Sequence, residues 1–104
     1  MLIVLTTTPS AEEAASLAEK IVAAKLAACV QILPKMTSVY VWEEKLQKDP
    51  EHLLLIKTLQ ENYAELEAFI VANHSYSVPE IVAIEAERVW GPYFEWMKKV
   101  VSGK

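Results

Sequence analysis

A long segment in the middle of the chain, from Cys29 to Thr58, constrains the fold more than any other feature. Its β-branched and aromatic residues favour extended strands, and Pro34 predicts an edge or a bulge in the first arm. Lys48-Asp49-Pro50 has the residue types of a turn, so His52 to Thr58 is expected to return as the second arm. Both arms exceed the ~5–6 residues of a usual strand. Because one small domain cannot cover such arms, we predict that they pair with other copies in a closed symmetric oligomer.

The segments around this hairpin complete an alternating pattern of strands and helices. Ser10 and Glu13 have the spacing of a capping box, which marks the start of a helix. The order strand, helix, strand, strand, helix, strand predicts an α+β, ferredoxin-like (split β-α-β) fold with an additional C-terminal helix. The remaining expected elements are a strand at Ile3–Leu5, helices from Ala11 to Lys25 or Ala27 and from Asn62 to Asn73, a strand from Glu80 to Val89, and a short helix opening at Pro92.

Length, charge and composition exclude several classes of protein. The 104 residues correspond to a single domain, 1–104, and 53% hydrophobic residues suffice for a core. The net charge of −4 and a single arginine, Arg88, leave no basic stripe for nucleic acid. No apolar run approaches the ~18 residues of a membrane span, and the first residues do not have the pattern of a signal peptide. The lone Cys29 cannot form an internal disulfide, so we expect a cytoplasmic protein.

Catalytic signatures are absent from the sequence. Its 2 glycines form no phosphate-binding loop or dinucleotide fingerprint, and neither histidine sits in a zinc-protease motif. A hydrolase of the acylphosphatase kind is the weakest hypothesis, because residues 6–9 form no glycine-bearing anion cradle and Arg88 is far along the chain. We therefore expect a protein that is not an enzyme.

Four titratable side chains are candidates for a site, and each also has a purely structural interpretation. His74 follows the second helix, where it either caps that helix or binds a metal ion. Cys29 lies in an apolar strand, which favours a buried thiol over a nucleophile, and His52 is expected to be an exposed strand residue. Lys57 ends an apolar run, so it either reaches solvent or pairs with a bound anion or a carboxylate such as Glu80.

The aromatic residues allow the same two interpretations. Tyr40, Trp42, Tyr76 and Trp96 could line a ligand pocket, although packing in a core or an interface is the favoured interpretation of each of them. Together with Cys29, Lys57 and Glu80 they define a candidate ligand cleft.

Four motifs in order along the chain resemble the CutA family of divalent-cation tolerance proteins. These are residues 25–31 (KLAACVQ), 37–42 (TSVYVW), 55–58 (LIKT) and 74–81 (HSYSVPEI). The resemblance implies a ferredoxin-like protomer, similar to the PII signalling proteins, and a homotrimer whose long hairpins pair across subunits. It also implies tolerance to copper and other divalent cations, with binding of Cu(II) or another divalent metal and no organic cofactor.

The resemblance carries over only part of the copper site attributed to a bacterial member. That site uses a cysteine at the end of the first strand and two adjacent histidines after the second helix. The matching positions here are Thr6, Asn73 and His74, so His74 is the one implied metal ligand. The alternative is a PII-like sensor of a small anionic metabolite, bound in the cleft between subunits by Lys57, Tyr40, Trp42 and Glu80.

Overall fold

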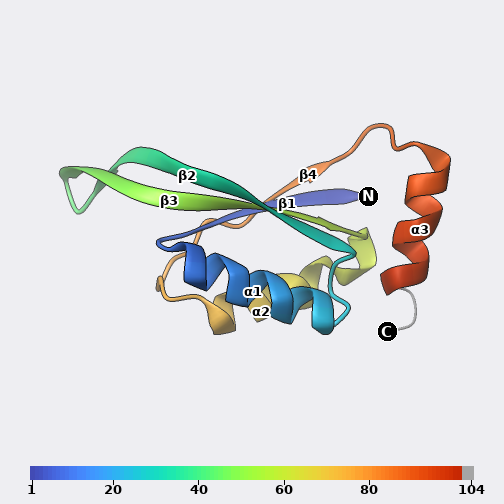
Figure 1. The fold of residues 1–104 in the computed structure, drawn as a ribbon. Coiled ribbons are helices and arrows are strands. Elements are labelled where there is room, and N and C mark those ends of the chain that lie inside the picture. Colours follow the sequence, from blue (N-terminus) through green and yellow to red (C-terminus); the bar gives the residue numbers. More distant parts are fainter. Residues whose placement is uncertain (102–104) are drawn as a thin grey trace.

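A single antiparallel sheet forms the centre of the computed structural model, which describes residues 1–101. Its four strands lie in the order β2-β3-β1-β4 (Figure 1). This is the strand arrangement of the predicted α+β, ferredoxin-like fold. The elements are β1 (Leu2–Thr8), α1 (Ala11–Ala23), β2 (Cys29–Trp42), β3 (Lys45–Thr58), the 3₁₀ turn η1 (Gln60–Asn62), α2 (Tyr63–Asn73), β4 (Val82–Glu85) and α3 (Gly91–Val101).

The main core lies between the sheet and the helices α1 and α2, which cover the same face (Figure 1). Alternate residues of β1 and β3 point into it, as strand geometry requires. Each fully buried Leu or Ile contributes about 1.5–3 kcal/mol relative to an exposed one. The apolar residues of this main core with no exposed surface are Val4, Ala14, Ile21, Ala27, Leu54, Ile56, Leu66 and Ile70.

The predicted hairpin is present, with two arms of 14 residues each. The register pairs Cys29 with Lys57 at one end and Trp42 with Lys45 at the other. The pairing shifts between Leu33 and Met36, so Pro34 lies at the predicted irregularity. The arms project beyond the helices (Figure 1), which leaves their outer half without a covering layer in the single chain.

The predicted position of the hairpin turn is wrong. The chain reverses at Glu43 and Glu44, which both have positive φ angles of 50° and 65°. Asp49 and Pro50 instead continue β3, where Pro50 pairs with Thr37. Between the hairpin turn and His52, β3 pairs with β2 alone, so its other edge is free. A residue without an N–H is tolerated on such an edge. Register along the whole hairpin, and not local turn chemistry, fixes where the chain turns.

Several further boundaries differ from the predictions, among them that of β1, which runs over Leu2–Thr8 and not only over Ile3–Leu5. Helix α1 ends at Ala23 because Lys25 adopts a left-handed conformation with φ of 60°, which ends the helix before Ala27. Strand β4 is limited to Val82–Glu85, the residues that pair with β1. The Ser10 cap is confirmed, since its hydroxyl accepts from the Glu13 N–H at 3.1 Å.

The face of the sheet that α1 and α2 do not cover is also apolar. Ile3, Leu5, Leu53 and Leu55 alternate with the core residues of β1 and β3 and are only half-buried. Helix α3 packs at the end of the sheet near the N-terminus (Figure 1), where Met97 and Val101 meet Ala28 and Leu59. Within residues 1–101, no helix is both long enough and apolar enough to cross a membrane.

Candidate functional site

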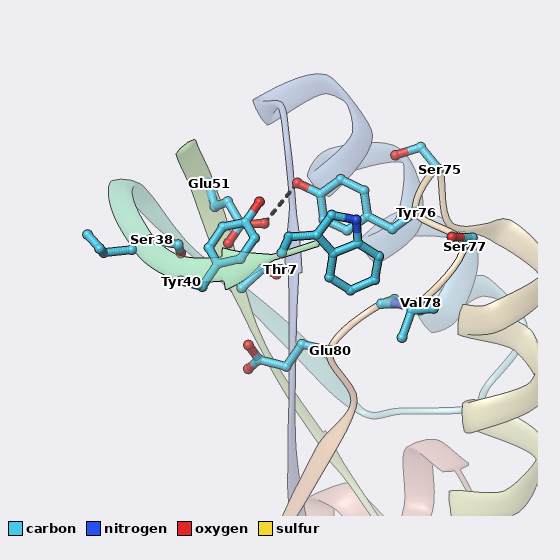
Figure 2. A pocket seen from close by; sticks show the side chains of 12 residues that line it. Thr7, Ser38, Tyr40, Glu51, Ser75, Tyr76, Ser77, Val78 and Glu80 are labelled. Atoms are coloured by element: carbon cyan, nitrogen blue, oxygen red, sulfur yellow. Dashed lines mark hydrogen bonds between the residues drawn. The ribbon is translucent and has the colours of Figure 1, made fainter. Parts of the chain in front are cut away.

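A cavity of about 880 Å³ lies where the free half of the hairpin meets the loop after α2. The loop after α2 supplies one wall, the two hairpin arms supply another, and the end of β1 contributes Thr7 (Figure 2). The lining residues are Thr7, Ser38, Val39, Tyr40, Trp42, Glu51, Ser75, Tyr76, Ser77, Val78, Pro79 and Glu80. The volume falls in the range of small-molecule sites.

Two tyrosine–carboxylate pairs organise this cavity. The Tyr76 hydroxyl donates to Glu51 Oε2 at 2.8 Å, and the Tyr40 hydroxyl donates to Asp49. Burial, followed by the bond to Glu51, raises the pKa of Tyr76 well above its usual range. The bond to Asp49 raises the pKa of Tyr40 in the same way. Both phenols therefore stay neutral donors that hold the carboxylates in place.

His74 is a structural anchor of the loop after α2. Its side chain has no exposed surface. Nε2 lies 2.7 Å from the Thr7 carbonyl oxygen and must donate to it, so Nδ1 accepts from the Tyr76 N–H at 3.0 Å. Glu13 completes the anchor, because it accepts from the Ser75 N–H at 3.0 Å and lies 3.6 Å from His74 Nδ1. The anchor ties the loop to β1 and α1.

These residues do not fit a copper site within one chain. A metal ligand needs a free nitrogen lone pair, but Nε2 of His74 donates to the Thr7 carbonyl and Nδ1 accepts from the Tyr76 N–H. Asn73 donates to the Phe69 carbonyl at 2.9 Å, and the buried Thr6 hydroxyl has no hydrogen-bond partner among residues 1–101. Nowhere in residues 1–101 do three or more His, Cys, Asp or Glu side chains gather closely enough to hold a metal ion.

The candidate ligand cleft separates into two places in the single chain. Tyr40, Trp42, Tyr76 and Glu80 line the cavity, whereas Cys29, Lys57 and Trp96 do not. Cys29 and Lys57 pair across β2 and β3 at the opposite end of the hairpin.

The surroundings of Lys57 differ from those expected. Its ammonium lies 3.4 Å from the Tyr93 hydroxyl and over the Tyr93 ring, and Tyr93 in turn contacts Trp96. Within one chain Glu80 is not its partner, because Glu80 lies in the segment before β4 and lines the cavity, whereas Lys57 lies in β3 away from that cavity.

Two structural expectations for titratable residues are also wrong. Cys29 is only half-buried, because its side of the sheet has no covering layer in the single chain. His52 is half-buried rather than exposed, because it shares a face with Thr8 at the edge of the core. Its buried Nδ1 has no hydrogen-bond partner in the part of the chain that the structure describes.

Sequence reasoning missed Thr7 and Glu51. Both are almost fully buried, with 4% and 7% of their surface exposed, yet both line the cavity. The sequence offered one signal for Glu51, since it alternates with Leu53 and Leu55 on the face away from the helices. The turn predicted at residues 48–50 conceals that alternation.

Comparison with known proteins gives a consistent result over nearly the whole chain. The model of the family described as CutA1 divalent ion tolerance protein matches residues 2–100. The chain is 45% identical over 97 residues to "Protein CutA, chloroplastic" of Arabidopsis thaliana, covering 93% of this chain and 53% of that protein. It thus spans about half the length of this plant relative. It is 40% identical to the divalent-cation tolerance protein CutA of Thermus thermophilus, covering 93% of this chain and 94% of the relative.

Solved structures agree with the sequence matches. The divalent cation tolerance protein of Thermus thermophilus superposes with a TM-score of 0.93 at 39% identity, covering 97% of this chain and 99% of that one. The CutA1 structure from Oryza sativa gives a TM-score of 0.94 at 42% identity, covering 96% and 92%.

The comparisons also correct the predicted cytoplasmic location. Plant relatives are named chloroplastic, and the CutA structure from Archaeoglobus fulgidus is described as periplasmic. The prediction is wrong because a lone cysteine excludes an internal disulfide but does not specify a compartment. The names of the relatives describe tolerance to cations and not a reaction. On the evidence of the family model and these relatives, the chain belongs to the CutA1 divalent ion tolerance family.

Proposed function

We propose that this protein acts in divalent-cation tolerance as a homotrimeric binding protein and not as an enzyme. The proposed assembly is supported by the apolar surface that remains uncovered in a single chain. In the outer half of the hairpin, Val41 and Leu46 pair across the strands with 65% and 68% of their surface exposed. Val82 and Ile84 of the edge strand β4 are exposed as well.

A surface of this kind is stable in water when copies of the chain cover one another. Strand β4 has a free edge, and the outer half of β3 has a neighbour on one side only, so both offer unpaired backbone groups to another copy. The copy number of three comes from the resemblance to the family and from no feature of the single chain.

The contact with divalent cations is proposed to be weak and to involve exposed carboxylates. The chain carries 14 acidic and 10 basic residues, so cations are attracted to it without a resident site. His74 is left out of this contact because its ring is buried and both of its nitrogens are hydrogen-bonded.

Native mass spectrometry with and without one equivalent of Cu(II) per chain tests both parts. We expect the mass of three chains, and copper adducts of the same small extent in the wild type and in His74→Ala. The variant should lose stability by about 1–3 kcal/mol, because the Tyr76 N–H and the Thr7 carbonyl lose a partner.

Two results would contradict the proposal. A mass of one chain would contradict the proposal that other copies cover the exposed apolar surface. Discrete copper steps that vanish in His74→Ala, at unchanged mass of the assembly, would show that His74 is a metal ligand after all.

A further inference from the structure

The projecting half of the hairpin joins the rest of the chain at a weakly supported level of the sheet. Strand β1 stops pairing with β3 at His52, so from Glu51 to the turn β3 pairs with β2 alone. At the same level the pairing of β2 with β3 shifts between Leu33 and Met36. A two-stranded ribbon is marginally stable by itself, and a bulge bends the strand that carries it. The outer half therefore needs a further contact to keep one direction relative to the core.

Tyr76 makes that contact from the loop after α2. Its hydroxyl donates to Oε2 of Glu51 at 2.8 Å, and Glu51 is the first residue of β3 beyond the pairing with β1 (Figure 2). Glu51 is 7% exposed already in the single chain, so this bond does not rely on the surface that is proposed to face other copies. The loop thus braces the hairpin at the level where the sheet supports it least.

The position of the loop is fixed in turn by Glu13 of α1. A glutamate at this place in a capping box bonds back to the N–H of the N-cap residue, which is Ser10 here. The Glu13 carboxylate instead accepts from the Ser75 N–H at 3.0 Å, 62 positions along the chain. The neighbouring His74 accepts from the Tyr76 N–H at 3.0 Å, and the two rings lie 5.0 Å apart. Glu13 therefore serves the loop and not the local cap.

We propose that the loop after α2 is a strut that fixes the direction of the outer hairpin, and that Glu13 is a positioning residue for the contacts between copies although it lies on α1. The path runs from Glu13 through the loop to Glu51, and each of its bonds is made within one chain. The inference rests on the proposed assembly, because the direction of the hairpin matters for function where copies meet. Association costs less conformational freedom when the hairpin is held in one direction beforehand.

Hydrogen exchange of the full chain, followed by mass spectrometry at one protein concentration, tests the strut. Glu13→Ala removes the acceptor of the Ser75 N–H. We expect the amides of residues 36–42 and 45–51 to exchange about fivefold faster, which is the effect of one lost hydrogen bond on a local opening, while the amides of β1 change at most about twofold. Glu13→Gln keeps an acceptor oxygen, so it should exchange within about twofold of the wild type.

Subunit exchange measures the consequence for assembly. When each protein is mixed with an isotope-labelled copy of itself, Glu13→Ala should form mixed complexes about fivefold faster than the wild type, as followed by native mass spectrometry. A wild type with the mass of one chain would overturn the proposed assembly, and the positioning role of Glu13 with it. An assembled wild type whose hairpin amides and subunit exchange are unaffected by Glu13→Ala would overturn the strut alone.

Two further variants make the test specific to the strut. Glu12→Ala removes the same charge from the exposed neighbour on α1 and should leave the hairpin amides unchanged. Tyr76→Phe removes the hydroxyl at the other end of the strut and should speed exchange of the same amides. The double variant Glu13→Ala/Tyr76→Phe should be no faster than the faster single variant, because both changes break one path. Faster exchange confined to α1 and the loop, an equal effect of Glu12→Ala, or effects that multiply in the double variant would each overturn the proposal.

Discussion

At the scale of single residues, the site depends on side chains whose neighbours come from distant segments. Tyr76 reaches Glu51 across 25 positions of sequence, and His74 reaches Thr7 across 67. His74 therefore positions the loop after α2, and its ring nitrogens are not available to a ligand. A histidine at this position predicts a possible metal ligand. The function of His74 depends on the hydrogen-bond partners of its two ring nitrogens, and only the packed structure identifies these partners.

The burial of Tyr76, together with its bond to Glu51, predicts a loss of stability at high pH. The pKa of Tyr76 is raised in the folded state, while in the unfolded chain it is about 10. The stabilisation is therefore fully present below pH 10 and is lost as the pH rises above 10 toward the folded-state pKa. Urea unfolding between pH 8 and 11.5 should show this decline in the wild type. Tyr76→Phe should be less stable at pH 8 and should decline less steeply, and an equal slope in both proteins would contradict the assignment.

At the scale of elements, the hairpin shows how register overrides local turn chemistry. Fourteen-residue arms pair from Cys29–Lys57 to Trp42–Lys45, and this pairing forces Glu43 and Glu44 to turn the chain. Neither residue favours a left-handed backbone, which costs roughly 1–2 kcal/mol per residue outside glycine. Pairing over the long arms outweighs this local cost.

The strained turn predicts a stabilising substitution. Glu44→Gly at φ of 65° should raise the free energy of unfolding by about 1 kcal/mol, because glycine adopts this conformation without strain. Lys48→Gly, in the extended part of β3, is the matched control and should destabilise by about 0.5–1 kcal/mol. Thermal unfolding of both variants at one protein concentration measures the difference. Destabilisation by Glu44→Gly would mean that the turn is not strained.

At the scale of the whole molecule, the single chain leaves one sheet face and half of a hairpin without a covering layer. The chain extends over 45 × 26 × 22 Å, and the projecting hairpin accounts for the long dimension (Figure 1). Val41 and Leu46 lie on this projection with most of their surface exposed. Association of several copies is the proposal that gives these side chains a partner.

A charge placed on the hairpin should therefore affect assembly, while the same charge elsewhere should not. Val41→Lys is expected to shift the complex toward monomers at micromolar concentration, because it buries an unpaired ammonium in the proposed interface. Val71→Lys is the control, since Val71 is 54% exposed on α2, away from the hairpin. Light scattering after size exclusion reports the mass. If both variants keep the wild-type mass and stability, the hairpin is not the interface.

The order of elements, the long hairpin and the cap at Ser10 could be predicted from the amino-acid sequence, because they follow from periodicity and local chemistry. The resemblance to the family came from four short motifs, and the family model confirms it. The tertiary structure decided the turn at Glu43 and Glu44, the anchoring of His74, and the separation of Lys57 from Tyr40 and Glu80. It also revealed Thr7 and Glu51 as lining residues. Each of these depends on strand register and on contacts between distant segments, and a one-residue change of register would move every side chain to the other face of the sheet.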